Sequence, residues 1–280
     1  MQIRDLTSLD DCRQVVALEK AIWGYADSDD VVGVPILVVT SKRGGILLGA
    51  FDERGAMIGF VYSLPGLKDG KPMQWSHMLG VVPAARDTGL GTTLKLAQRR
   101  RALAMGIELV EWTYDPLMAL NAHLNFTKLG IVVSEYEENI YGDSTSVLHK
   151  GTPTDRFVAE WWLRKPHVER RLAPKPAASP RSSGVLDAPP VLDTGRDGTW
   201  TVPGAFDLAR TDRRLSVEIP AAFGDMMARA PEVAMRWRLA TRAVFTAYFA
   251  RGYRAVDFFL DKRTRAGRYL LAQADDTDTP

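Results

Sequence analysis

Apolar and polar positions along the first part of the chain follow patterns that predict alternating strands and helices. Short apolar or alternating runs are typical of strands, and segments whose apolar residues recur every three to four positions are typical of helices. Strands are expected at residues 2–6, 45–52, 56–64, 74–82, 109–114 and 131–136, and helices at residues 8–22, 89–105 and 117–129. Residues 23–44 are expected to be irregular. The pattern therefore predicts an α/β fold.

The pattern changes towards the C-terminal half. A strand is expected at residues 156–163, and residues 171–203 are then rich in proline, alanine, serine, glycine and aspartate. This composition offers no continuous apolar face, so an extended, partly ordered connector is expected there. Beyond it the pattern predicts a strand at 215–219, a helix at 232–249 and a strand at 253–260. The expected domains are residues 1–165, a connector at 166–203 and a C-terminal α/β extension at 204–275.

Glycines stand where the strand at 74–82 leads into the helix at 89–105. Pro83 ends the strand because it has no amide hydrogen and restricts Val82 before it. Gly89 and Gly91 let an anion approach the backbone, and the first amides of a helix have no internal partner. Together with the helix dipole, these amides favour a phosphate, and Arg86 adds a guanidinium nearby. The turn is therefore predicted to hold a pyrophosphate.

The residues of this turn also allow other interpretations. The hydroxyls of Thr88 and Thr92 could cap the helix or contact a phosphate, and an ordinary strand–turn–helix corner stays an alternative. The Walker motif needs a lysine where Thr92 follows Gly91, and the dinucleotide fingerprint needs a glycine or alanine where Leu94 stands. A domain that binds ATP or NAD is therefore disfavoured.

The remaining pattern, Arg-x-x-Gly-x-Gly at residues 86–91, resembles the acyl-CoA-binding motif of the GNAT superfamily of N-acetyltransferases. The order of elements and the helix end Asn125-Phe126-Thr127-Lys128-Leu129-Gly130 are similar to that family too. The segments 112–117, 121–125, 141–142 and 155–157 with Trp161 resemble a poorly characterised subgroup that carries a C-terminal extension. The resemblance covers roughly residues 1–165 and implies a mixed, mostly antiparallel sheet flanked by helices.

The C-terminal extension contains a second helix end of similar form. Residues 247–253 resemble the helix end at residues 125–130, so the extension is interpreted as a degenerate half of the same fold that shares or extends the sheet. A helix followed by a strand is common, however, and this stays the alternative. No second glycine turn of the phosphate type accompanies it, so one cofactor site per chain is expected.

The resemblance implies an N-acyltransferase that moves an acetyl or larger group, such as succinyl, from CoA to an amine through a tetrahedral intermediate. Acetyl-CoA or another acyl-CoA is then the cosubstrate, and no metal is expected. Backbone amides near Leu79 to Val81 are the implied oxyanion donors, and the pantetheine arm is expected to pair with the same strand edge. The residues implied to bind the cofactor are Leu79, Val81, Val82, Arg86, Asp87, Thr88, Gly89, Leu90, Gly91, Thr92, Asn121, Phe126 and Lys128.

Three residues are candidates for catalysis: His77, Asp115 and Tyr141. An imidazole titrates near neutral pH, so His77 could accept the amine's proton, although a buried structural histidine is the plain alternative. Asp115 could accept a proton or hold an ammonium, but an aspartate before Pro116 also makes a good helix cap. Glu111 is a weaker candidate.

The source of the proton for the departing sulfur is open. The family's tyrosine would fall at Phe126, which has no proton to give, so Tyr114 or Tyr141 is the alternative donor. A thiol has a pKa of about 8.5, so a thiolate can also leave without a donor.

Composition narrows the class of protein. The chain has 280 residues, 46% of them hydrophobic, and a formal net charge of +2. Cys12 is the single cysteine, so no internal disulfide is expected, and no leader or long apolar run predicts secretion or membrane insertion. Three arginines at residues 99–101 are a weak footprint for nucleic acid and favour a solvated helix face. A cytoplasmic enzyme is therefore expected, and the resemblance to the GNAT superfamily implies a homodimer.

The acceptor is the least determined part of the prediction. Charged residues such as Arg156 and Arg238 would suit a small amine that bears a carboxylate, for example an amino acid. The alternative function is a non-catalytic protein of the same fold that binds or senses CoA thioesters or an amino acid.

Overall fold

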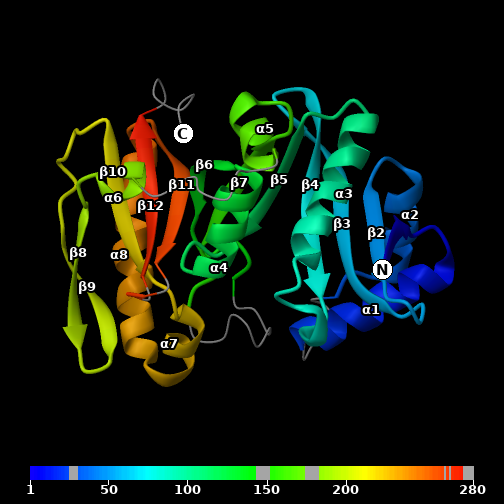
Figure 1. Ribbon diagram of the computed structural model, residues 1–280, viewed down its shortest axis with the longest axis horizontal. Coiled ribbons are helices and arrows are strands. Elements are labelled where there is room, and N and C mark those ends of the chain that lie inside the picture. Colours follow the sequence, from blue (N-terminus) through cyan, green and yellow to red (C-terminus); the bar gives the residue numbers. More distant parts are fainter. Residues whose placement is uncertain (25–30, 143–151, 174–182, 262, 265, 274–280) are drawn as a thin grey trace. The chain divides into compact units, whose positions relative to one another are not determined.

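The computed structural model describes residues 1–24, 31–142, 152–173, 183–261, 263–264 and 266–273 (Figure 1). These residues form two compact units, which meet in sequence between Trp112 and Thr113. Unit 1 holds residues 1–112, and unit 2 holds the described residues from 113 onwards. Each unit is described by itself.

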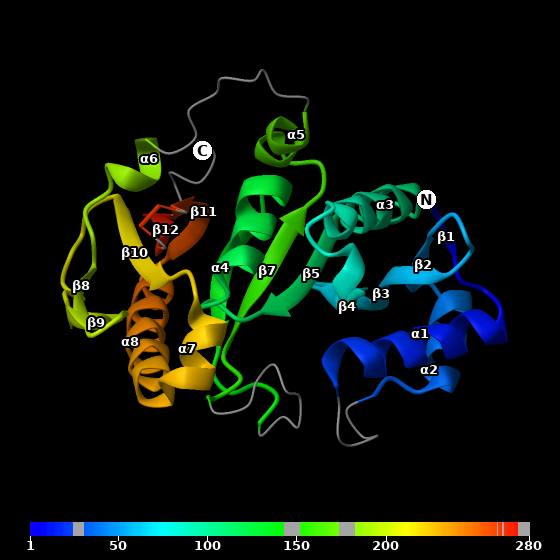
Figure 2. The same ribbon diagram turned by 60° about the horizontal axis from the view of Figure 1, so that its bottom comes forward.

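Unit 1 is built on strands in the order β1 (Gln2–Asp5), β2 (Ile46–Phe51), β3 (Met57–Lys68), β4 (Lys71–Val81) and β5 (Leu109–Tyr114), the last of which runs into unit 2. Strands β1 to β4 are antiparallel neighbours, whereas β4 and β5 are parallel. Helices α1 (Leu9–Trp23) and α2 (Val34–Lys42) cover one face of these strands, and α3 (Leu90–Ala104) covers the other (Figure 2).

Local sequence explains where α1 begins and ends. Ser8 accepts a hydrogen bond from the Asp11 amide, and the Asp11 carboxylate accepts one from the Ser8 amide, which together form a capping box. Gly24 ends the helix in the left-handed conformation, with φ of 59°. The apolar face of α1 packs with α2 over the sheet, in a cluster of Leu6, Cys12, Val15, Leu37, Leu47, Phe51, Met57, Phe60, Tyr62 and Met78.

The end of α1 lies directly on β4. A Cβ atom at Gly80 would lie 2.8 Å from the Phe60 ring and 2.9 Å from the Ile22 side chain. Gly80 therefore permits a close approach of helix and strand that a larger residue would prevent. This contact fixes the face of β4 just before the glycine turn.

Unit 2 contains an antiparallel sheet in the order β7 (Arg156–Trp162), β6 (Val132–Glu137), β11 (Tyr253–Asp261), β12 (Ala266–Gln273) and β10 (Arg214–Pro220). Its helices are α4 (Ala119–Ala122), which continues as a π-helix, η3 (His123–Leu129), and α5 (Pro166–Leu172), α6 (Ser183–Leu186), α7 (Phe223–Arg229) and α8 (Pro231–Ala250). A separate hairpin of β8 (Leu192–Asp197) and β9 (Trp200–Phe206) contacts α8.

The two halves of the unit 2 sheet repeat one arrangement. Gly130 and Gly252 each follow a helix in the left-handed conformation, with φ of 74° and 81°. Val133 and Ala255 are each the third residue after that glycine, and these two residues pair where β6 meets β11. The register also shifts directly after each of them, in the β6–β7 and β11–β12 pairs. The extension therefore repeats a helix, strand, strand order, and its interpretation as a degenerate half-fold stays a prediction.

Most of the expected elements are present within a few residues of their predicted bounds, and the mixed, mostly antiparallel sheet is confirmed. Several expectations are wrong or incomplete. The stretch expected to be irregular contains α2, and α7 and β12 were not expected. The described residues of the expected connector form α5, α6, β8 and the start of β9, because apolar residues such as Val185, Val191 and Val202 are buried there despite the many prolines. Residues 174–182 of the expected connector lie outside the described residues. The domain boundaries at residues 165 and 203 stay a prediction.

Two properties concern the part of the chain that the structure describes. Its helices include none whose length and apolar character would let it cross a membrane. Its histidine, cysteine, aspartate and glutamate side chains form no group of three or more that could hold a metal ion.

Candidate functional site

Strands β4 and β5 pair only where they begin. Their parallel partners are Gln74 with Val110 and Trp75 with Glu111, and among the described residues the ladder goes no further. On its other side β4 stays paired with β3 as far as Val81. Residues 76–81 therefore have an edge without a β5 partner. Backbone amides and carbonyls on such an edge need hydrogen-bond partners, so an extended ligand can pair with them.

A β-bulge lies at the start of this unpaired edge. Tyr62 pairs with Met78 and Leu64 with Trp75, so Ser76 and His77 both lie opposite the single residue Ser63. Bulges redirect side chains and are frequent beside active sites. The bulge therefore changes the side-chain alternation of β4 at His77.

The His77 imidazole is exposed and contacts the Tyr62 ring edge to face, with ring centroids 5.9 Å apart. Desolvation by the surrounding protein lowers the pKa of His77 below its ordinary value. The imidazole is therefore neutral at pH 7 and able to accept a proton. This places His77 at the unpaired edge, as a general base for the predicted reaction would require.

The glycine turn follows β4 directly. A short 3₁₀ turn, η2 (Pro83–Ala85), leads to Gly89, which precedes α3 in the left-handed conformation with φ of 85°. No side chain caps α3 at Gly89, and no described atom lies within 4 Å of the position that a Cβ there would take. Open space and free first-turn amides at a helix N-terminus fit an anion. The predicted cradle thus has the required backbone geometry.

The side chains of the turn are mostly exposed. The Arg86 side chain is exposed and its Nε donates to the Val81 carbonyl at 3.4 Å. The Thr88 hydroxyl donates to the Ala85 carbonyl at 2.8 Å, so it braces the turn and does not cap α3. Asp87 has a φ of 61°, which is uncommon for a residue with a side chain. The residues predicted to line the edge and turn lie there: Leu79, Val81, Val82, Arg86, Asp87, Thr88, Gly89, Leu90, Gly91 and Thr92.

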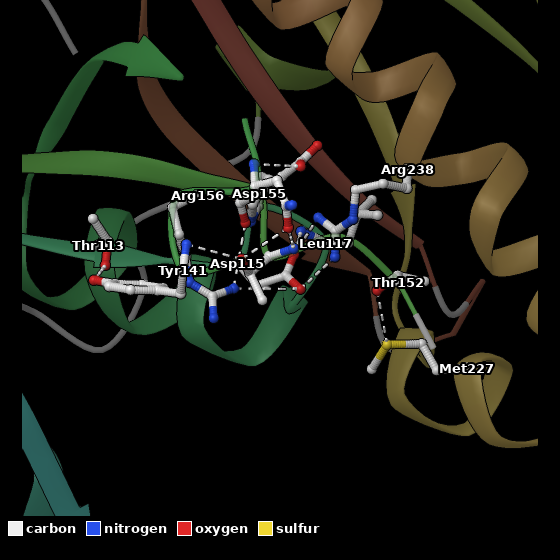
Figure 3. A network of polar contacts seen from close by, with 12 residues as sticks. Thr113, Asp115, Leu117, Tyr141, Thr152, Asp155, Arg156, Met227 and Arg238 are labelled. Carbon is white, nitrogen blue, oxygen red and sulfur yellow. Dashed lines mark hydrogen bonds and ion pairs between the residues drawn. The ribbon is translucent and has the colours of Figure 1, made fainter. Parts of the chain in front are cut away.

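Unit 2 contains a network of polar contacts around Asp115 (Figure 3). Arg238 of α8 donates two hydrogen bonds to the Asp115 carboxylate, at 2.8 and 2.5 Å, and the Leu117 amide donates a third at 2.9 Å. Arg156 lies 3.9 Å from the same carboxylate. Burial acts to raise the pKa of Asp115, but the charge and hydrogen bonds of Arg238 outweigh it and hold the pKa below its ordinary value. Asp115 is thus a buried anchor, which speaks against its predicted role as a base.

Tyr141 lies at the exposed side of the same network (Figure 3). Its hydroxyl is 2.8 Å from the Thr113 hydroxyl, and the Arg156 guanidinium lies 5.6 Å from its ring centroid. Asp155 accepts hydrogen bonds from Arg242, at 2.8 and 2.7 Å, and from the Tyr136 hydroxyl at 2.6 Å. Because Tyr141 is 48% exposed, its hydroxyl can reach solvent, and Tyr141 remains the predicted proton donor.

The structure disfavours some of the other sequence candidates. Phe126 is completely buried against the Tyr269 ring, with centroids 5.7 Å apart, so it cannot line a cofactor in this structure. Burial raises the pKa of Tyr114 well above its ordinary value, which disfavours it as a donor. Glu111 forms an ion pair with Lys68. Of the remaining predicted cofactor residues, Asn121 and Lys128 are exposed in unit 2.

The sequence analysis missed two sets of buried polar residues. Lys95, Ser76 and Gln98 form one set beside the unpaired edge in unit 1, and Glu19 is buried under α2 with one oxygen bonded to the Val32 amide. A lysine between Leu94 and Leu96 on a helix with a buried face was a usable signal. The pairing of Asp115 with Arg238 had no local signal, because 123 residues separate them.

Comparisons with known proteins bear on the fold. No protein-family model matches the sequence, and no curated protein matches it either. Similar solved structures include aminoglycoside 6'-acetyltransferase type Ii, an acetyltransferase of the GNAT family from Streptococcus pneumoniae, and yncA from Salmonella typhimurium with its cofactor acetyl-CoA. Each is 18% identical, with TM-scores of 0.45, 0.46 and 0.44. They cover 63%, 57% and 64% of this chain and 100%, 97% and 99% of their own.

These likenesses concern a GNAT-like fold over part of the chain, as expected from the sequence. At TM-scores below 0.5 they assign no activity and no substrate to this protein.

Proposed function

We propose that this protein is an N-acyltransferase that moves an acetyl or larger acyl group from CoA to the amine of a small molecule. The observation that carries the proposal is the unpaired edge of β4 over residues 76–81, which leads directly into the open glycine turn at the start of α3. An extended amide-bearing arm can pair with the edge, and a pyrophosphate can bind the helix N-terminus. One continuous stretch of chain thus offers both contacts.

Each residue role follows from the chemistry of acyl transfer. The amine nitrogen bonds to the thioester carbon, the carbon–sulfur bond breaks, and the sulfur leaves with its electron pair. His77 accepts the proton that the amine loses, and edge amides near Leu79 to Val81 donate to the oxygen that gains charge. Acetyl-CoA supplies the activated acyl group, and succinyl-CoA is the alternative. Tyr141 stays the proposed donor to the sulfur.

The acceptor is proposed to be a small amine, and an amino acid is the first class to test. Arg238 cannot bind the carboxylate of an amino-acid acceptor while both terminal nitrogens of Arg238 bind Asp115. A homodimer, a cytoplasmic location and the absence of a nucleic-acid partner stay predictions.

A non-catalytic CoA-thioester sensor is the second candidate function. The burial of Phe126 and the buried ion pair of Asp115 favour it, because two positions expected to serve the site are occupied by core contacts.

The first test measures thermal stabilisation of the protein by acetyl-CoA, succinyl-CoA, CoA, ATP and NAD. A ligand at a hundred times its dissociation constant should stabilise the fold by about 2.7 kcal/mol. We expect stabilisation by the CoA compounds and none by ATP or NAD. Absence of any effect of CoA compounds would contradict both candidate functions.

The second test separates the enzyme from the sensor through release of free CoA thiol with a panel of amines. We expect His77→Gln to lower the rate by about a hundredfold or more while acetyl-CoA still stabilises the protein. His77→Gln with an unchanged rate would remove His77 as the base. No thiol release with any amine, in a protein that binds acetyl-CoA, would favour the sensor.

A further inference from the structure

A buried lysine lies at the point in unit 1 where β4 and β5 separate. Their last paired residues are Trp75 and Glu111, so Ser76 and Trp112 are the first residues of each strand beyond the ladder. Lys95 of α3 contacts both of them. Its Nζ donates to the Ser76 hydroxyl at 2.9 Å and lies 3.6 Å from the centroid of the Trp112 ring.

The Lys95 ammonium uses all three of its N–H donors. Besides Ser76 and the face of Trp112, it donates to Gln98 Oε1 at 3.2 Å, and the Gln98 amide donates to the Ser76 hydroxyl at 3.0 Å. An indole face attracts a cation, so the three contacts match a charged amine. The ammonium is therefore held in one position relative to Ser76, the first residue of β4 beyond its pairing with β5.

This arrangement is costly if it serves stability alone. Lys95 is 3% exposed, and among the described residues no carboxylate forms an ion pair with it. Burial lowers the pKa of Lys95 well below its ordinary value, which reflects the cost of the charge. A long apolar side chain of similar volume usually stabilises such a position as well or better. The structure thus contains an unpaired buried charge where an apolar residue would suffice for packing.

We propose that Lys95 is a positioning residue for the acyl-CoA site, a wedge that keeps β4 and β5 from pairing beyond Trp75 and Glu111. Its hydrogen bond to Ser76 and its contact with the Trp112 ring leave available to a ligand those amides and carbonyls of residues 76–81 that do not pair with β3. This inference rests on the proposed function, because an open edge is useful only if a ligand pairs with it.

The variant Lys95→Met tests the wedge, because methionine keeps the length and removes the charge and its hydrogen bonds. We expect the melting temperature to stay the same or rise, since an uncompensated charge leaves the core. Hydrogen exchange at the backbone amides of residues 76–81 should slow, as the two strands pair further. The dissociation constant for acetyl-CoA, measured by calorimetry, should rise about tenfold, which corresponds to 1.4 kcal/mol.

Lys42→Met is the matched control, because Lys42 is an exposed lysine of α2 in the same unit. It removes one positive charge without changing the point where β4 and β5 separate, so exchange and affinity should stay at the wild-type values. If Lys95→Met fails to fold, Ser76→Ala is the second variant. It removes the hydrogen bond from Lys95 to β4 and keeps the lysine, and it should shift hydrogen exchange and acetyl-CoA affinity in the same directions.

Two different failures can be told apart. A folded Lys95→Met protein with wild-type exchange at residues 76–81 and wild-type affinity overturns the wedge and leaves the proposed function standing. A wild-type protein that binds no acyl-CoA overturns the proposed function, and with it the role of Lys95 toward that cofactor, whatever the exchange data show.

Discussion

Single buried charges are the residues for which sequence and structure differ most. His77 and Asp115 were both ranked as bases from their strand positions, yet only His77 is exposed at an unpaired edge. Asp115 is neutralised by Arg238 from a distant helix, and no local pattern reveals such a partner. Lys95 and Glu19 were not predicted as functional candidates, although both are buried. Each lies at a helix position among apolar residues, and the helix pattern does not show whether a charged side chain there is buried. Burial of a charge is a tertiary property that a local pattern predicts poorly.

Glu19 should make the stability of the protein depend on pH. Its side chain is fully buried and accepts one hydrogen bond, from the Val32 amide at 3.0 Å. Burial raises the pKa of Glu19 from 4.5 to about 7, although the Val32 hydrogen bond acts against the rise. Between these two pH values the folded protein binds more protons at this site than the unfolded chain. The contribution of Glu19 to stability therefore falls as pH rises from 4.5 to 7.

The variant Glu19→Gln should remove this dependence. We expect its free energy of unfolding, from urea titrations at pH 5, 6, 7 and 8, to exceed that of the wild type at pH 8 by up to about 3 kcal/mol. Near pH 5 the two proteins should be similar. Glu53→Gln, in the exposed turn between β2 and β3, is the control and should keep the wild-type slope. An unchanged slope in Glu19→Gln would show that Glu19 titrates normally in the folded protein.

Elements with a strong local signal were predicted well. The strand, the glycine turn and α3 were all expected within one to three residues of their bounds, because Pro83 and the glycines mark the turn by their backbone chemistry. The elements that were missed lack such marks. In β12, Leu270, Leu271 and Ala272 form an apolar run without alternation, which does not distinguish a strand from a helix. The β8–β9 hairpin is concealed by a composition typical of loops.

Substitutions at Gly89 should separate the backbone role of the turn from its proposed role in binding. Gly89→Ala should lower the free energy of unfolding by about 1 kcal/mol, because alanine is disfavoured at positive φ, and Gly89→Asn should lower it less. Both side chains enter the open space beside α3. Both variants should therefore bind acetyl-CoA more weakly than the wild type in calorimetry.

Gly106→Asn serves as the control for this pair. Gly106 follows the other end of α3 with a φ of 74°, and no described atom lies within 4 Å of the position that a Cβ there would take. It should keep the wild-type affinity for acetyl-CoA. Equal affinity in the Gly89 and Gly106 variants would argue against a phosphate at the start of α3.

At the scale of the whole molecule, the C-terminal extension is part of the core of unit 2. Arg238 of α8 neutralises Asp115, Tyr269 of β12 donates to the Pro116 carbonyl at 2.6 Å, and Thr127 donates to the Phe258 carbonyl at 2.9 Å. Phe157 of β7 packs against Phe245 with ring centroids 4.6 Å apart. The resemblance seen in the sequence ends near residue 165, but these contacts cross that point. These contacts predict that the folding unit extends beyond the residues that carry the resemblance.

A fragment of residues 1–165 should consequently fail to form a native unit 2. It would lack Arg238 beside Asp115 and would expose aromatic side chains that the extension covers, such as Phe126 and Phe157. Burial of each such side chain contributes about 1.5–3 kcal/mol, a large part of the 5–15 kcal/mol that stabilises typical domains. We expect this fragment to lose the near-ultraviolet circular dichroism and cooperative urea unfolding that the full chain shows. A fragment of residues 1–273, which ends after β12 and keeps every contact named above, should retain both. Cooperative unfolding of the shorter fragment with native-like dichroism would mean that residues 1–165 fold as an independent domain, and the contacts of Arg238, Phe245 and Tyr269 would then be those of a domain interface.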